Sequence, residues 1–229
     1  MTGASLPPEL RRLVEQDLSP VRPLPPPWVR ALVVLAWAVA VLLAVLVVGG
    51  VRADAGELGV LGAWGGAVLE ILAGFALIAL ALREAVPGAA LPRASLAGAL
   101  LAAALVAAAT AVFTWVRAAP VASGCPLTAG MSCFAMEFTM GVPALAVTVL
   151  LAVRALPVRP RWAGVLGGVG SGLLADGLQH LICPVSDLSH VLVWHVGAIV
   201  GLGCAGWLAG WGVERWRARS LGRGTPWAP

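Results

Sequence analysis

Three cysteines stand beside long apolar segments, where thiol chemistry could link one segment to another. Cys125 and Cys133 lie in Ser123-Gly-Cys-Pro-Leu-Thr-Ala-Gly-Met-Ser-Cys-Phe-Ala-Met-Glu137, before one apolar segment, and Cys183 ends a later one. The chain has no C-x-x-C pair, which counts against dithiol redox chemistry of that type. A disulfide between Cys133 and Cys183 would clamp two helices, and its reduction would release them. A static bridge or an inert buried thiol remains an open alternative.

Cys133 is expected near a helix N-terminus, where the helix dipole stabilises a thiolate. Glu137, one turn later, opposes this effect when it is ionised. Further possible ligands follow near the end of one apolar segment and the start of the next: His180, Cys183, Asp187, His190 and His195. Together with Cys133 and Glu137 they could bind a transition metal through sulfur and imidazole. Their spacing matches no zinc signature, so hydrogen bonding to a neighbouring helix is the favoured role for these histidines.

Two carboxylates fall inside apolar segments, at Glu70 and Asp176. Ionisable groups at such positions are costly and suggest a function, such as a proton or ion path. A protonated, hydrogen-bonded role within the helix bundle is the favoured interpretation. Cys204, in mid-segment, is interpreted as a small hydrophobic residue.

The elements that must position these residues are membrane helices. The chain is 60% hydrophobic and 11% charged, whereas soluble domains carry about 25% charged residues. Six segments each have the roughly 20 residues that a helix needs to cross a bilayer: 28–51, 58–82, 94–116, 134–153, 162–182 and 191–213. The sequence therefore predicts an all-α, six-transmembrane-helix bundle, with the first span retained as an uncleaved anchor.

The arginines predict the orientation of this bundle. Thirteen of the fifteen fall in the two tails and in the second and fourth loops, and only Arg52 and Arg117 fall on the other side. By the positive-inside rule, both termini are cytoplasmic and the three cysteines face outward. Small-xxx-small patterns at Gly164-xxx-Gly168-xxx-Gly172 and Gly206-xxx-Gly210 favour close helix packing, as does Gly197-xxx-Gly201.

Residues 1–27 form the largest polar segment, and residues 214–229 form a short cytoplasmic tail. Pro7-Pro8 and Ser19-Pro20 bracket a short predicted helix. An apolar face on this helix would bind a partner, because a helix this short is marginal alone. The residues of this face are Leu10, Leu13, Val14 and Leu18. A proline-rich spacer follows it.

The chain resembles the NrsF family in three segments that occur in a fixed order. These are the amino tail, the segment from Cys125 to Glu137, and Cys183 followed by Val193-Trp-His195. Members are membrane-bound negative regulators of extracytoplasmic-function (ECF) sigma factors in bacteria. The resemblance implies that the cytoplasmic amino segment holds a sigma factor at the inner membrane, through a binding surface that comprises Leu10, Leu13, Val14, Asp17 and Leu18. It also implies that Cys133 and Cys183 sense redox or heavy-metal stress and release the sigma factor, with Cys125 as a further thiol. It implies no cofactor and no direct contact with nucleic acid.

Two other functions remain as alternatives. A membrane thiol-disulfide oxidoreductase would use the cysteines, although the missing C-x-x-C counts against it. A small proton- or ion-coupled transporter would use Glu70 and Asp176, but it gives no role to the amino tail. Nothing in the sequence resembles a nucleotide-binding loop, a nucleophilic triad or a metalloprotease helix, so we expect no enzyme.

Overall fold

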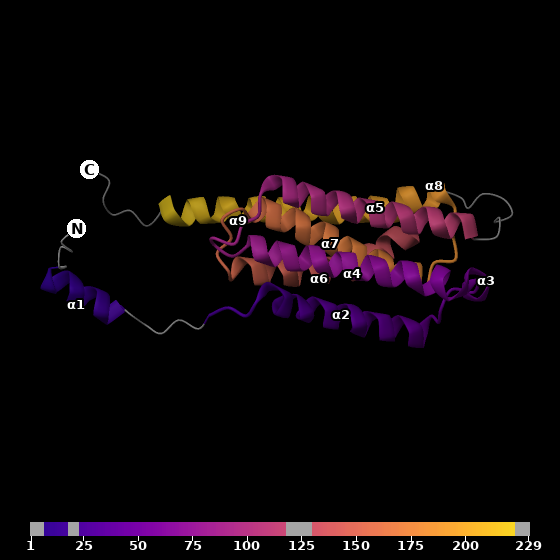
Figure 1. The fold of residues 1–229 in the computed structure, drawn as a ribbon, viewed down its shortest axis with the longest axis horizontal. Coiled ribbons are helices and arrows are strands. Elements are labelled where there is room, and N and C mark those ends of the chain that lie inside the picture. Colours follow the sequence, from indigo (N-terminus) through magenta and orange to yellow (C-terminus); the bar gives the residue numbers. More distant parts are fainter. Residues whose placement is uncertain (1–6, 18–22, 118–129, 223–229) are drawn as a thin grey trace.

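A computed structural model describes residues 7–17, 23–117 and 130–222, and every regular element in these ranges is helical (Figure 1). The helices are α1 (Pro8–Asp17), α2 (Pro27–Val48), α3 (Ala55–Val60), α4 (Gly66–Glu84), α5 (Arg93–Arg117), α6 (Gly130–Val153), α7 (Pro160–His180), α8 (Leu188–His190) and α9 (Val196–Gly222). Two π-helical turns, η1 (Leu61–Gly65) and η3 (Val191–His195), join α3 to α4 and α8 to α9. The predicted all-helical architecture is confirmed for the described residues.

Five helical segments of the described chain are long and apolar enough to cross a membrane: Pro27–Val48, Ala55–Glu84, Arg93–Arg117, Gly130–Val153 and Leu188–Ser220. Large apolar side chains cover their outer surfaces, with Val47 and Val48 more than 80% exposed. Such surfaces are stable in lipid but not in water. The chain is therefore a multi-pass membrane protein in its architecture.

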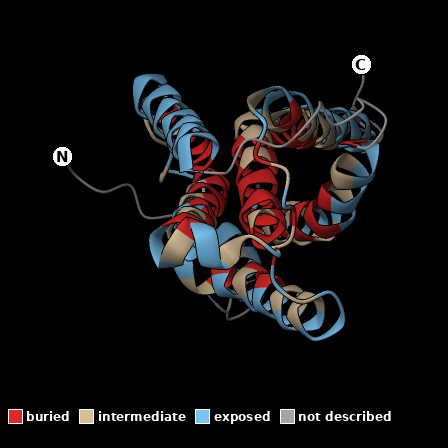
Figure 2. Cartoon of the chain, turned by 90° about the vertical axis from the view of Figure 1, so that its right-hand side faces the viewer, coloured by how far each residue is buried: buried red, intermediate tan, exposed pale blue. Residues whose placement is uncertain are grey.

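The segment expected as the fifth of six spans is α7, and it differs from the other long helices in its position. It packs against α4, α6 and α9, and most of its residues are buried (Figure 2). Neighbouring helices, rather than lipid, cover α7, so it can carry Ser171, Asp176 and Gln179 among its buried side chains. Because protein surrounds it, α7 can be less apolar than the five segments that are apolar enough to cross a membrane.

Glycines allow α7 to lie in backbone contact with both of its main neighbours. A Cβ atom at Gly164 would lie 2.0 Å from the carbonyl oxygen of Gly206 in α9, and one at Gly168 would lie 2.2 Å from that of Leu202. Towards α4, a Cβ atom at Gly74 would lie 2.5 Å from the carbonyl oxygen of Gly170. Close packing therefore explains the glycines of the α7–α9 contact.

Several helix boundaries differ from the predicted spans. The second span begins at Ala55 and is broken at Gly59, whose φ of 69° favours glycine. The last helix continues beyond residue 213 to Gly222, since no proline or glycine interrupts the sequence from 214 to 221. Glu214 in this extension pairs with Arg161 at 2.6 Å.

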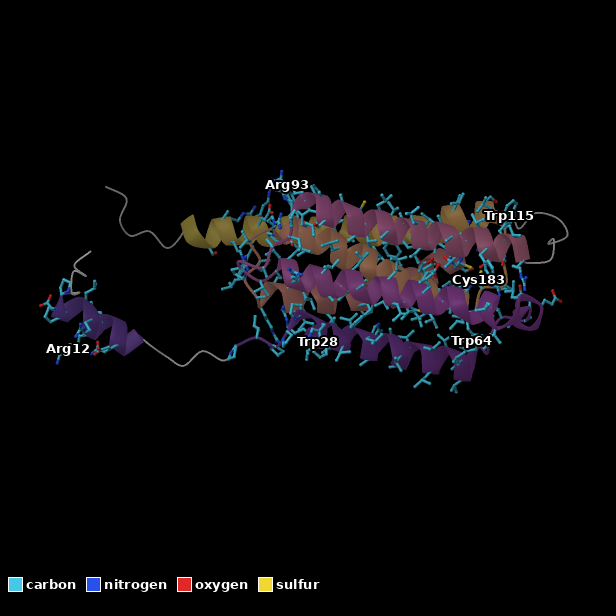
Figure 3. All side chains as sticks on the ribbon, in the orientation of Figure 1. Arg12, Trp28, Trp64, Arg93, Trp115 and Cys183 are labelled. Carbon is cyan, nitrogen blue, oxygen red and sulfur yellow. The ribbon has the colours of Figure 1, made fainter. Side chains whose placement is uncertain are left out.

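The two ends of the bundle differ chemically (Figure 3). Cys183 lies at one end with Trp64 and Trp115, and we call this the thiol end. Trp28 and Arg93 lie at the opposite end, which we call the arginine end. Tryptophan near both ends is typical of helices that span a bilayer.

The arginine end also holds buried polar contacts. The Arg30 side chain is buried and donates to the carbonyl oxygen of Leu82 at 2.9 Å. Arg159 pairs at 2.6 Å with Glu84, whose carboxylate is fully buried. These contacts fix the starts of α2 and α7 to the end of α4.

Candidate functional site: a thiol–imidazole cluster

Cys133 and Cys183 meet at the thiol end, although fifty positions separate them in the sequence. Cys133 lies in the first turn of α6 and is partly buried, and Cys183 lies just beyond α7 and is buried. Their Sγ atoms are 3.7 Å apart and both thiols are free. The pair expected from the sequence is thus in contact, while Cys125 lies outside the described residues. Cys204 is free and exposed, on α9.

The loop that carries Cys183 is held by Arg52. This side chain is buried and donates to Ser186 Oγ at 2.7 Å and to both carboxylate oxygens of Asp54, at 2.6 and 2.8 Å. Its backbone N–H donates to the carbonyl oxygen of Leu181 at 2.8 Å. The hydrogen bonds from Arg52 lower the pKa of Asp54, against the opposing effect of burial. The sequence alone indicates only a loop charge at Arg52, although Asp54, two positions later, is a signal for an ion pair.

His190 and His195 reach the same place because of the π-helical turn between them. Asp187 caps α8 by accepting hydrogen bonds from the backbone N–H groups of Ser189 and His190, at 2.9 and 3.2 Å. Its hydrogen bond from the Ser189 side chain is the main cause of a lowered pKa for the Asp187 carboxyl. Residues five apart share a face in a π-helix, and the two imidazole rings have centroids 5.4 Å apart. Sequence periodicity of 3.6 residues could not reveal this pairing.

Four side chains thus form what we call the thiol–imidazole cluster: Cys133, Cys183, His190 and His195. One sulfur or ring nitrogen from each lies within 4.8 Å of all the others. Cys183 Sγ lies 3.7 Å from His190 Nε2. All members except Cys133 are buried.

Carboxylates lie behind His195. Its Nδ1 is 2.8 Å from Asp176 Oδ1 and 3.6 Å from Glu137 Oε2. Nδ1 is therefore paired with a carboxylate, whereas Nε2 has no hydrogen-bond partner among the described residues. Both oxygens of the buried Glu137 also lack a hydrogen-bond partner among the described residues.

Two other candidate residues lie beside the cluster but outside it. Glu70 accepts a hydrogen bond from Thr110 on α5 and lines a small cavity with Asp176 and His195. His180 Nε2 lies 3.2 Å from the carbonyl oxygen of Gly62, so this ring bridges α7 to η1 and is not a cluster member. The structure therefore gives Glu70 and His180 hydrogen-bonding positions between helices.

The amino-terminal residues lie far from the cluster. Helix α1 is separate from the membrane helices and is seen beyond the arginine end (Figure 1). Leu10 and Leu13 are 46% and 62% exposed. Val14 and Asp17 are helical, but their side chains are not described, and Leu18 lies outside the described residues.

A family model described as NrsF, negative regulator of sigma F, matches residues 14–216. The chain belongs to the NrsF family. The matched range contains every residue of the thiol–imidazole cluster and all of the membrane helices up to residue 216 of α9, but it begins after Leu10 and Leu13. NrsF is a family of regulators rather than of enzymes. Comparisons with curated proteins and with solved structures gave no match.

Proposed function

We propose that this NrsF-family protein is a membrane-bound anti-sigma factor. It holds an ECF sigma factor at the inner membrane through its cytoplasmic amino segment and releases it when its outward-facing thiols meet redox or heavy-metal stress. The observation that carries the sensing half is the 3.7 Å contact between Cys133 and Cys183, which joins α6 to the end of α7. The family description, negative regulator of sigma F, supports the proposed inhibition of a sigma factor.

The proposed topology has six spans with both termini cytoplasmic. Helix α7 is the fifth span in chain order and is added to the five apolar segments: its 21 residues correspond to a length of about 31 Å, which matches the hydrocarbon core. The concentration of arginine in the tails and in two loops supports a cytoplasmic arginine end and an outward thiol end. The alternation of six antiparallel helices then brings both tails to the arginine end.

Exposed leucines on α1 support its role in capture. An isolated ten-residue helix gains little stability in water, so burying Leu10 and Leu13 against a partner would order it. A segment that orders on its partner suits reversible capture.

Helix α7 supports a route from the thiols to the tails. Cys183 follows its last turn, and its N-terminus begins beside Arg159, which pairs with Glu84 at the arginine end. A change in how α6 and α7 pack at one end would therefore displace groups at the other, provided the bundle has two arrangements close in free energy.

Copurification tests the capture. The full-length protein in detergent would be mixed with each ECF sigma factor of the same cell. We expect one sigma factor to bind, and Leu13→Asp to lose at least ten-fold in affinity. Gln16→Asp is the matched control, since it adds the same charge at an exposed position away from the apolar face of α1. Equal binding by both variants would contradict a role for this face, and no binding to any sigma factor would contradict the function.

A further inference from the structure

We propose that the thiol–imidazole cluster binds a divalent d¹⁰ cation of the Zn²⁺ and Cd²⁺ class. Cys133 and Cys183 supply two sulfur ligands, and His190 and His195 supply two nitrogen ligands. The proposal rests on the proposed function in one respect: the bound cation would be one of the signals that the sensing thiols detect. It is argued from the geometry of the four side chains.

Two separations between donor atoms match those of a tetrahedral site, and the others are within 4.8 Å. With metal–sulfur bonds of about 2.3 Å and metal–nitrogen bonds of about 2.0 Å, tetrahedral angles place two sulfurs roughly 3.8 Å apart and a sulfur and a nitrogen roughly 3.5 Å apart. The two Sγ atoms are 3.7 Å apart, and Cys183 Sγ is 3.7 Å from His190 Nε2. A disulfide bond would instead need a separation of about 2.05 Å.

The surroundings orient the histidines as ligands. In the neutral tautomer of His195 whose Nδ1–H donates to Asp176, the lone pair of Nε2 is available to a cation, as in carboxylate–histidine–metal groups. This nitrogen is buried and has no other hydrogen-bond partner in the described part of the chain. The Asp187 cap fixes the backbone of His190.

Charge balance also favours a divalent cation. Binding displaces one proton from each thiol, so two thiolates and two neutral imidazoles surround a 2+ ion, and the ion with its four ligands carries no net charge beside the Asp176 carboxylate. A neutral group avoids most of the desolvation cost that separate charges would carry in these largely buried positions. Thiolate and imidazole donors select zinc-like cations over Mg²⁺ or Ca²⁺.

The test is metal titration of the reduced, full-length protein in detergent, in a Cys204→Ser background that removes the exposed thiol of α9. Co²⁺ is the spectroscopic probe, and Zn²⁺ and Cd²⁺ compete with it. We expect one tetrahedral Co²⁺ per chain with thiolate charge-transfer bands from two sulfurs. Because Asp176 only orients a ligand, Asp176→Asn should weaken binding about 10- to 100-fold.

Histidine variants decide whether the site is the four-residue cluster. His190→Ala and His195→Ala should each weaken Co²⁺ binding at least ten-fold, whereas His180→Ala, outside the cluster, should bind as the parent does. His190→Cys should retain binding with a third thiolate band. Thermal unfolding without metal checks that each variant is folded.

The proposal would be overturned if Co²⁺ binding depended on the cysteines but was equal in His190→Ala, His195→Ala and His180→Ala. It would also be overturned if the folded parent showed no saturable Co²⁺ binding. Either failure is distinguishable from failure of the proposed function, because sigma-factor capture is measured separately and without added metal.

Discussion

At the scale of single residues, Cys133 and Cys183 are close enough to be oxidised to a disulfide after a small movement. The two thiols would lose two protons and give two electrons to the oxidant. We expect diamide to produce a Cys133–Cys183 link in the full-length protein, detected by peptide mass spectrometry. The exposed Cys204 on α9 serves as the internal control and should not join this link. A dominant link to Cys125 would instead identify a different sensing pair.

Asp54 gives a pH dependence with a definite sign. Hydrogen bonds from Arg52 lower the pKa of Asp54 below its usual 3.8, so the carboxylate stabilises the fold at pH values above 3.8. This stabilisation is lost as the pH falls through the lowered folded-state pKa. Because the Asp54 side chain is partly exposed to solvent, the contribution should be under about 1 kcal/mol.

The measurement is the unfolding midpoint of the detergent-solubilised protein between neutral pH and pH 2. Asp54→Asn should lower stability at neutral pH and reduce the acid-dependent loss. Asp187→Asn is the comparison, since that carboxyl also has a lowered pKa but lies outside the Arg52 contacts. Identical acid profiles for the parent and Asp54→Asn would show that the Arg52–Asp54 pair does not contribute.

At the scale of elements, the contact between α7 and α9 depends on the absence of side chains at a few positions. In Gly168→Ala the new Cβ would lie 2.2 Å from the carbonyl oxygen of Leu202, so the two backbones must separate. We expect a loss of roughly 1–3 kcal/mol in unfolding free energy, as for overpacked cores. Denaturant titration in mixed micelles measures it.

Gly197→Ala on α9 is the matched control, because a Cβ there has no neighbour within 4 Å. It should leave stability unchanged or slightly raised, since alanine favours helix over glycine. If both alanine variants behaved alike, the close approach of α7 and α9 would not limit stability.

At the scale of the whole molecule, the proposed topology places the two tails on one side of the membrane. Green fluorescent protein fused after residue 229 should fluoresce, and alkaline phosphatase fused there should be inactive, if that terminus is cytoplasmic. The reciprocal fusion to the loop after Arg52 should give the opposite result. Active phosphatase at the carboxyl terminus would require an odd number of spans, with α7 not crossing.

Residue types and spacing alone determined the helical membrane architecture, since apolar length and low charge leave few alternatives to membrane helices. They also identified the cysteines and histidines of the cluster and, through resemblance, the family. They did not place α7 at the centre, because hydropathy measures apolarity but not whether lipid or protein provides the surroundings.

The tertiary structure decided which candidates meet. His195 joins Cys133 and Asp176 because the π-helical turn η3 turns it toward the same side as His190, and no local pattern encodes that rotation. Arg52, which sequence reasoning assigned to topology alone, is buried against the loop of Cys183. The sequence by itself determined which thiol, imidazole and carboxylate groups are available and that lipid surrounds the helices. Only packing decided which donor atoms come within ligand distance, because that depends on contacts between helices far apart in the chain.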